Sequence, residues 1–385
     1  MHNFNVSDHK RLPPEGVRKV QQASEVRKKG DAERIRGLGD RALADGHNAS
    51  AAECYLRAAN YFRTAEFYLH GDPNDPRILS LWGESRDLFV KSLQLSGVDF
   101  ERVSITYENT TLPGYFYMVD ASGERRATLI LMNGFDGTQE ELYAGAMAAM
   151  KRWYNVLTFD GPGQGAALRV QNLTFRADWE KVITPVIDHL LNRSDVNSSK
   201  IALWSLSMGG YLAPRAAAYD HRLAAVIADG GVYDIVGGTA LQFIRNATSM
   251  QEAKMEFLGG MWEAPDMYNG IFRSMMANST NMRWSLEHGM YAFGQKTPVD
   301  YYMALSEMTM NGIAVNITCP TLVCDGTNDT AMPRGQTMML YSNLTCPRTY
   351  HLFNSTDGAG LHCQLGATIQ GNMVKLDWLE TAMPA

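Results

Sequence analysis

The 385-residue sequence has little of several features that would assign it to a specialised class of protein. Its formal net charge is only −6, which indicates no basic surface for nucleic acid or an anionic membrane. No apolar run approaches the ~20 residues of a membrane-spanning helix, and the first ten residues lack the apolar core of a signal peptide. The five cysteines are an odd number without metal-binding spacing. These absences predict a cytoplasmic protein with reduced thiols and with neither nucleic acid nor membrane as a partner.

What the sequence does contain is a serine at a tight turn between an apolar run and a run of small residues. The apolar stretch 201–204 leads into Ser205-Leu-Ser207-Met-Gly209-Gly210. Small residues two positions before and two after a nucleophile let a strand and the following helix approach each other. Ser205 and Gly209 meet this need, so the pattern predicts a nucleophile elbow with Ser207 at its tip. The alternative is an ordinary serine in a glycine-rich loop.

An acid and a histidine follow the serine, each after an apolar run. Asp325 and Asp329 come after the run 320–324, and His362 lies in a glycine-rich loop after the last predicted strand. Serine, acid and histidine thus follow in the chain order of α/β-hydrolases. In such a triad the acid orients the imidazole, and the imidazole takes the proton from the serine. We prefer Asp329 because it lies beyond the Gly326 turn, where a carboxylate can reach a histidine loop, and Asp325 is the alternative.

The other histidines do not fit this pattern. His351 lies inside the last predicted strand, where we interpret it as a packed or hydrogen-bonded structural residue. The remaining seven are interpreted as surface or capping residues: His2, His9, His47, His70, His189, His221 and His288. Cys363 adjoins His362, and we interpret its thiol as a packing group because the elbow already supplies a nucleophile.

Two glycine-containing loops precede the elbow. The apolar run 127–132 leads into the segment 133–137, where such a fold places its second oxyanion-hole amide, so we assign the hole to the backbone N–H groups of Met208 and Phe135. A further run leads into Asp160-Gly-Pro-Gly-Gln-Gly-Ala166, which can be read as the dinucleotide fingerprint G-x-G-x-x-A. Its proline and the hydrolase elements on both sides favour a structural turn. We therefore expect no cofactor and no metal.

Four segments together resemble one branch of the α/β-hydrolases. They are Asn133–Glu141, Phe159–Gly165, Ser205–Gly210 and Gly358–Gln364, within a likeness that spans roughly residues 50 to 380. The branch includes the dihydroxypseudooxynicotine hydrolase and the fungal yellowish-green pigment hydrolases that shorten polyketides, and it is related to fermentation-respiration-switch-type esterases. The resemblance implies a serine hydrolase that breaks a carbon–carbon bond next to a ketone.

The resemblance also singles out Asp136. The matching position of the nicotine-degrading relative holds an acidic residue implicated in catalysis, which implies a catalytic role for Asp136 beside the triad. The alternative is a turn aspartate that bonds its own backbone between two glycines. Asp325 and Ser205 depart from the branch, where histidine and glycine are common, and this bears on the substrate. A carboxylesterase or lactonase, an acyltransferase, and a non-catalytic binding protein on a hydrolase fold remain open.

The pattern of elements predicts an α/β-hydrolase fold with two helical additions. Residues 1–100 carry small and aromatic residues at helical spacing and predict an accessory helical domain. Residues 101–231 and 313–385 hold the two halves of the hydrolase core. The segment 232–312 has no strand signal, and we expect it to be a helical cap inserted over the active site.

The expected cap is rich in methionine and aromatic residues, with 11 of the 22 methionines. Such residues at helical spacing are most often core, but flexible thioethers also line irregular apolar pockets. We place Tyr233, Trp284 and Tyr301 in the substrate pocket. The expected partner is a small apolar or aromatic substrate, and a homodimer stays open.

Overall fold

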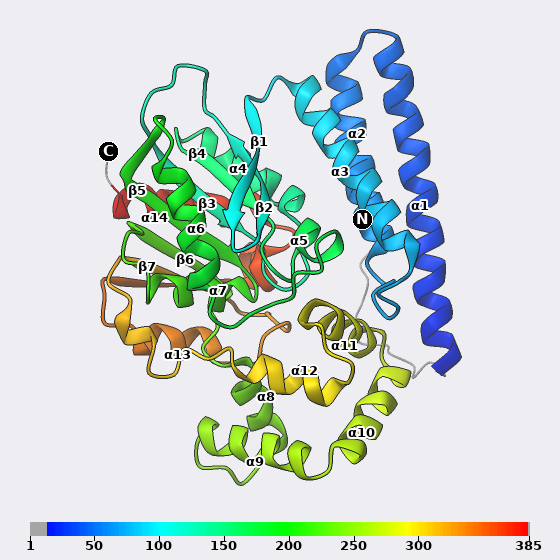
Figure 1. Ribbon diagram of the computed structural model, residues 1–385, viewed down its shortest axis with the longest axis vertical. Helices are drawn as coiled ribbons and strands as arrows, with labels where there is room; N and C mark the ends of the chain where they lie inside the picture. Colours follow the sequence, from blue (N-terminus) through cyan, green and yellow to red (C-terminus); the bar gives the residue numbers. More distant parts are fainter. Residues whose placement is uncertain (1–13, 384–385) are drawn as a thin grey trace. The chain divides into compact units, whose positions relative to one another are not determined.

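The computed structural model describes residues 14–383, so predictions for His2, His9 and the first ten residues lie outside the described part of the chain. The strands are β1 (Phe100–Tyr107), β2 (Thr110–Tyr117), β3 (Arg126–Met132), β4 (Asn155–Phe159), β5 (Val196–Leu206), β6 (Ala225–Asp229), β7 (Thr321–Gly326) and β8 (Arg348–Phe353). The helices are α1 (Pro14–Ala44), α2 (Asn48–Glu66), α3 (Pro76–Ser96), α4 (Tyr143–Met150), α5 (Gly165–Arg169), α6 (Glu180–Leu191), α7 (Gly209–Ala217), α8 (Ile235–Phe243), α9 (Met250–Glu263), α10 (Pro265–Asn278), α11 (Thr280–Phe293), α12 (Pro298–Ser306), α13 (Gln336–Asn343) and α14 (Thr368–Ala382) (Figure 1).

The chain forms two compact units. One consists of the described residues up to Gly97 together with Gly260–Tyr301, and the other begins at Val98, runs to Gly259 and resumes at Tyr302. The first contains helices alone among its described residues. The second contains the sheet and every predicted catalytic residue.

The second unit is built around a mixed eight-stranded sheet with the order β1-β2-β4-β3-β5-β6-β7-β8. Strand β2 pairs antiparallel with β1 and β4, and the strands from β4 to β8 are parallel neighbours. Every residue of β4 and β6 is buried, as expected for parallel strands with both faces covered. Helices α6 and α7 pack on one face of the sheet, and α4 and α14 lie on the other (Figure 1).

Parallel strands bring their carboxyl ends to one edge of the sheet, where open α/β sheets bind ligands. The residues at this edge come from segments far apart in the sequence: Asn133 after β3, Asp160 after β4, Ser207 after β5, Asp229 at the end of β6 and Asp325 in β7. The topology therefore gathers the predicted motifs in one place.

The segment after β6 is helical, as predicted, and contains α8–α12. Asp234 caps α8 because its Oδ1 accepts the N–H of Gly237 at 2.7 Å. Its Oδ2 lies 2.7 Å from Nζ of buried Lys254, which also donates to the backbone oxygen of Ser306 at 2.6 Å. These contacts join the start of the insertion to its end.

The N-terminal helices are also present as predicted. Helix α1 packs on α2 and α2 packs on α3, while α10 and α11 contact α1 within the same unit. Helix α3 shows its local signals clearly: the Asp75 carboxylate accepts the N–H of Arg77 at 2.9 Å, Pro76 opens the helix, and Gly97 follows it with φ +70°. Because this unit combines α1–α3 with part of the insertion, the boundaries at 100, 231 and 312 stay predictions.

The helices and the cysteines can also be compared with the composition of the chain. Among residues 14–383, no helix has both the length and the apolar character that crossing a membrane requires. All five cysteines are free thiols. Burial raises the pKa of the Cys319 thiol to about 12 and that of Cys363 well above its ordinary value, so both stay protonated near neutral pH.

Candidate functional site

Ser207 lies at the tip of a sharp turn between β5 and α7. Its φ is +63°, a left-handed conformation that residues with a Cβ rarely adopt. Two backbone hydrogen bonds hold the turn. The N–H of Ser207 donates to the backbone oxygen of Asp229 at 2.8 Å, and the backbone oxygen of Ser207 accepts the N–H of Gly210 at 2.7 Å. A Cβ on Gly209 would lie 1.7 Å from Ser205 Oγ. The small-residue motif thus has a direct steric cause.

His362 links Ser207 to Asp329. Its Nε2 lies 2.8 Å from Ser207 Oγ, and its Nδ1 lies 2.6 Å from Asp329 Oδ2. Asp329 Oδ1 accepts the N–H groups of Ala331 at 2.8 Å and Met332 at 3.4 Å. Burial acts to raise the pKa of Asp329, but the hydrogen bond and charge of His362, with these amides, hold it below its ordinary value. An ionised Asp329 keeps a proton on Nδ1 and leaves Nε2 to accept the serine proton.

Asp325, the alternative acid, faces other groups. Its Oδ2 accepts hydrogen bonds from the hydroxyls of Thr337 and, at 2.8 Å, Tyr350. Burial and then the hydrogen bond to Asp325 raise the pKa of Tyr350 to about 12, so this phenol remains a donor. Asp329, which bonds the imidazole itself, therefore has the geometry that a triad acid requires.

The predicted oxyanion loop lies against the elbow. A Cβ on Gly134 would lie 2.4 Å from the oxygen of Leu206 and 2.7 Å from the nitrogen of Met208. The Met208 amide and the loop that carries Phe135 are therefore neighbours, as a two-amide oxyanion hole requires. Asp136 lies in the same loop and is partly exposed. The catalytic roles of these residues stay predictions.

Gln164, which was not among the residues predicted from the sequence, supports this loop. Its Nε2 donates to the backbone oxygens of Asn133 and Gly134, both at 2.7 Å, and its Oε1 accepts the N–H of Gly161 at 3.1 Å. The Asn133 amide closes the loop by donating to the oxygen of Thr138 at 2.6 Å. Two side-chain amides thus fix the loop that approaches Ser207. The only sequence signal was the position of Gln164 inside the glycine-rich segment.

Asp160 holds the glycine-rich turn from inside. It is buried, and its two oxygens accept the N–H groups of Gln139 at 2.9 Å and Ala166 at 2.8 Å. Burial and then the neighbouring Glu140 raise the pKa of Asp160 to about 7. A Cβ on Gly165 would lie 2.0 Å from the Asp160 carboxylate. The glycine makes room for the protein's own side chain, which is the behaviour of a structural turn.

The interpretation of His70 and His288 as surface or capping residues is wrong. They are 2% and 1% exposed, and their Nδ1 atoms lie 2.8 Å apart. His70 Nε2 lies 2.6 Å from one oxygen of Glu66, and Arg63 donates to the other at 2.9 Å. Buried polar groups need such partners. The sequence hides them because the two histidines are 218 residues apart.

The other histidines lie closer to their predicted environments. His47 and His221 are exposed, and His351 is in β8, with its ring 4.4 Å from that of Phe353. His189 is partly buried, and this burial lowers its pKa. Four of the chain's histidines thus have environments in which a structural role is sufficient.

The three residues predicted to line the substrate pocket make packing contacts. Tyr233 is buried at the start of the insertion, and its hydroxyl donates to Asn311 Oδ1 at 3.2 Å. Trp284 in α11 stacks on Phe67 with ring centroids 4.8 Å apart, and Tyr301 is buried. Core residues make the same kinds of contact. A contact with substrate therefore stays a prediction for all three.

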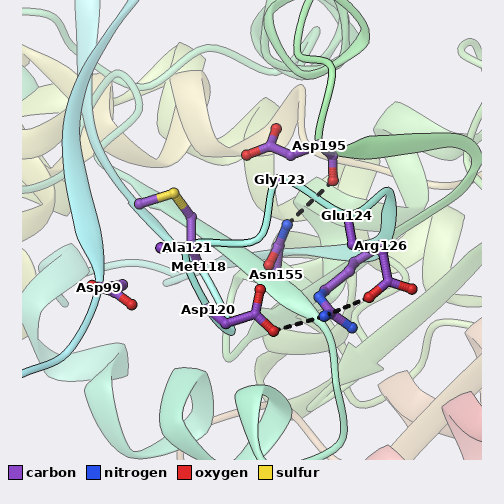
Figure 2. A pocket seen from close by; sticks show the side chains of 9 residues that line it. All are labelled: Asp99, Met118, Asp120, Ala121, Gly123, Glu124, Arg126, Asn155 and Asp195. Carbon is purple, nitrogen blue, oxygen red and sulfur yellow. Dashed lines mark hydrogen bonds and ion pairs between the residues drawn. The ribbon is translucent and has the colours of Figure 1, made fainter.

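A cavity of about 250 Å³ lies at the opposite edge of the sheet, by the amino ends of β3 and β4. Figure 2 shows Arg126 between Asp120 and Glu124, whereas Asp99 and the Asp195 carboxylate lie apart from this cluster. Arg126 pairs with Asp120 and Glu124, both at 2.7 Å. Asn155 Nδ2 donates to the backbone oxygen of Asp195 at 3.3 Å. This cavity is separate from the edge that carries Ser207.

Comparisons with known proteins are consistent with this geometry. Residues 129–360 match the model of the alpha/beta hydrolase family. Hydrolase LUC6 of Fusarium sp is 33% identical over 368 residues, which cover 91% of this chain and 85% of LUC6. The 20-hydroxy-prefusarin hydrolase FUS2 of Gibberella moniliformis is 32% identical over 369 residues, with the same two coverages.

A solved structure shows the same fold. The 2,6-dihydroxy-pseudo-oxynicotine hydrolase matches with a TM-score of 0.72 and 21% sequence identity, over 93% of this chain and 88% of its own. The predicted fold, with its helical insertion and N-terminal helices, is thereby confirmed, and so is the resemblance on which the expectations of function rest. The chain belongs to the α/β hydrolase family and is a hydrolase related to the fungal hydrolases LUC6 and FUS2.

Proposed function

We propose that the protein is a serine hydrolase that cleaves a carbon–carbon bond next to a ketone through an acyl-serine intermediate. The observation that carries the proposal is the position of His362, 2.6 Å from Asp329 and 2.8 Å from Ser207. This arrangement supports a serine nucleophile with an oriented general base. The choice of a carbon–carbon bond is supported by the four-segment resemblance described above. The proposed substrate is a small polyketide, acyl-aromatic compound or β-diketone.

The reaction on a β-diketone follows from these groups. Ser207 Oγ attacks one carbonyl carbon and passes its proton to His362, while the N–H groups of Met208 and Phe135 stabilise the oxyanion. The adduct collapses by breaking the bond to the α-carbon, which leaves as an enolate and receives the proton from His362. Water, activated by His362, then attacks the acyl-serine. One diketone and one water thus give one carboxylic acid and one ketone.

Asp136 is proposed to serve the carbon–carbon reaction specifically. An ester leaves as an alkoxide, which His362 can protonate directly. A carboxylate can assist the departure of a carbon leaving group, because it can bind a substrate hydroxyl or take part in the proton transfer to the leaving carbon. Asp136 lies in the loop next to the elbow, and the hydrogen bond that closes this loop comes from Asn133. Replacing Asp136 therefore leaves that bond in place.

The variant Asp136→Asn tests the proposal. It is nearly isosteric, and we expect it to lower kcat for ketone cleavage by about 10² or more while hydrolysis of small chromogenic esters stays within about threefold. A panel of β-diketones, polyketide intermediates and esters provides the substrates. Asp99→Asn, at the opposite edge of the sheet, controls for the loss of a carboxylate. Equal losses on ketones and esters, together with a lower Tm, would assign Asp136 to the turn.

The same panel separates the other functions. Ester or lactone turnover without ketone cleavage would indicate a carboxylesterase or lactonase, and transfer to an added alcohol or amine would indicate an acyltransferase. A folded protein that shows no covalent adduct with a fluorophosphonate would indicate a binding protein. We also propose that residues 232–312 act as a cap that selects apolar or aromatic substrates.

A further inference from the structure

Three buried polar side chains form a closed ring next to the histidine turn. Asp229 ends β6, Gln364 is two residues after His362, and Lys375 lies in α14, and these three ring residues are 0%, 2% and 2% exposed. Lys375 Nζ donates to Asp229 Oδ2 and, at 2.6 Å, to Gln364 Oε1. Gln364 Nε2 donates to Asp229 Oδ1 at 3.1 Å. Each residue of this ring thus bonds the other two.

The ring reaches both reacting side chains through the backbone. Gln364 and His362 belong to one short 3-10 turn, His362–Gln364. On the other side, the backbone oxygen of Asp229 accepts the N–H of Ser207 at 2.8 Å and the thiol of Cys363 at 3.6 Å. Asp229 therefore bonds the elbow with its carbonyl group and the histidine turn with its carboxylate.

The histidine turn has a backbone that needs such support. Cys363 and Gln364 have φ values of +48° and +53°. Two consecutive residues with a Cβ are thus held in the left-handed region, which is unfavourable for L-amino acids. Such a conformation persists only where the surrounding structure fixes it. The hydrogen bonds of the Gln364 side chain supply this fixation, and a Cβ on Gly371 would lie 3.0 Å from its Oε1.

Stability alone is a weak reason for this ring. A buried ion pair is often no more stabilising than well-packed apolar residues of similar volume. Its hydrogen bonds are directional, however, and here they connect three separate elements. Lys375 Nζ also lies 4.6 Å from the centre of the indole group of Trp204, which belongs to the strand that leads to Ser207. The three residues Asp229, Gln364 and Lys375 thus join β6, the histidine turn and α14, and Lys375 also contacts the nucleophile strand.

We propose that Gln364 and Lys375 are positioning residues for His362. Together with Asp229 they fix the histidine turn relative to the elbow, which keeps His362 Nε2 2.8 Å from Ser207 Oγ. This inference rests on the proposed function, because it requires that His362 activates Ser207.

Gln364→Met is the primary test. Methionine keeps the length and volume of the side chain, removes its hydrogen bonds, and leaves the Lys375–Asp229 pair intact. We expect the rate constant for fluorophosphonate labelling of Ser207, and kcat for a small chromogenic ester, to fall by at least about tenfold. KM should change little. Tm should fall, because the variant loses two buried hydrogen bonds to charged groups, so labelling is measured at a temperature where the variant is folded. The matched control is Asn372→Leu, which removes a buried side-chain amide in α14 that donates to the backbone oxygen of Ala144.

A charge-free double variant keeps the test decisive if Gln364→Met does not fold. Asp229→Leu combined with Lys375→Met replaces the ion pair by apolar side chains, so no buried charge is left unpaired. We expect a folded protein with the same loss of labelling rate. Wild-type labelling in a folded Gln364→Met or double variant, or an equal loss in Asn372→Leu, would overturn the positioning role.

The labelling experiment also separates this inference from the proposed function. If the wild-type protein does not form an adduct at Ser207, the proposed function fails. If the wild-type protein is labelled at Ser207 and Gln364→Met is labelled as fast, the proposed function stands and the positioning role is refuted.

Discussion

Gln164→Met should separate the oxyanion loop from the glycine-rich turn that supports it. In the wild-type protein the buried Gln164 side chain donates to the oxygens of Asn133 and Gly134 and accepts from Gly161. Methionine has a similar length and no comparable donor or acceptor. The substitution therefore removes three hydrogen bonds without opening a large cavity.

The size of the effect follows from these contacts. Each hydrogen bond contributes about 0.5–1.5 kcal/mol net, so the loss of three should lower the free energy of unfolding by roughly 1.5–4.5 kcal/mol. Removing an oxyanion donor outright lowers kcat by about 10²–10³. Since Gln164→Met displaces the loop without deleting the Phe135 amide, we expect a loss near the lower end, about 10².

The assay is kcat for a small chromogenic ester at a temperature where the variant is folded, with urea unfolding measured in parallel. Gln171→Met is the matched control, because Gln171 accepts a long hydrogen bond of 3.4 Å from Thr110 and bonds neither Asn133 nor Gly134. A destabilised Gln164→Met enzyme with wild-type kcat would refute the claim that this side chain sets the geometry of the oxyanion loop.

Three further predictions address the acid, the insertion and a buried carboxyl group. Asp329→Asn should lower kcat by at least about 10² and by more than Asp325→Asn, because Asp329 alone of the two bonds the imidazole; the reverse order would exchange their roles. Trp284→Ala should raise KM for large aromatic substrates while kcat for small esters is kept, and an equal loss on small esters would assign Trp284 to the fold. The pKa of Asp160 is raised to about 7, so the free energy of unfolding should fall as pH rises from about 4 to 7 and then level off. The free energy of unfolding, measured by urea unfolding at each pH, should change less with pH in Asp160→Asn than in the wild-type protein. An unchanged pH dependence would contradict the raised pKa of Asp160.

The strands that carry the site were predictable because their burial leaves a direct mark in the sequence. Strands β4 and β6 are buried throughout, and most of their residues are apolar. The elbow was predictable for a steric reason, since the space beside Ser207 admits only glycine at position 209. The hairpin of β1 and β2 was not resolved into strands, because its turn contains Glu108 with φ +45° in place of a glycine signal.

The supporting contacts could not be predicted, because they join residues that only the fold brings together. Gln164 bonds a loop thirty residues earlier, and Asp229 bonds Lys375 across 146 positions. Glutamine and lysine are mostly exposed in folded proteins, so their burial here has no signature in the sequence. His70 and His288 were misjudged for the same reason, since their polar partners are apparent only in three dimensions.

The central claim is that His362 activates Ser207 as the nucleophile. Its most direct test is to incubate the wild-type protein with a fluorophosphonate, measure the intact mass, and map the adduct by peptide sequencing. We predict one adduct on Ser207, none in Ser207→Ala, and labelling slowed by at least about 10² in a folded His362→Ala variant. An adduct on another residue, no adduct on the folded wild-type protein, or wild-type labelling in His362→Ala would contradict the account.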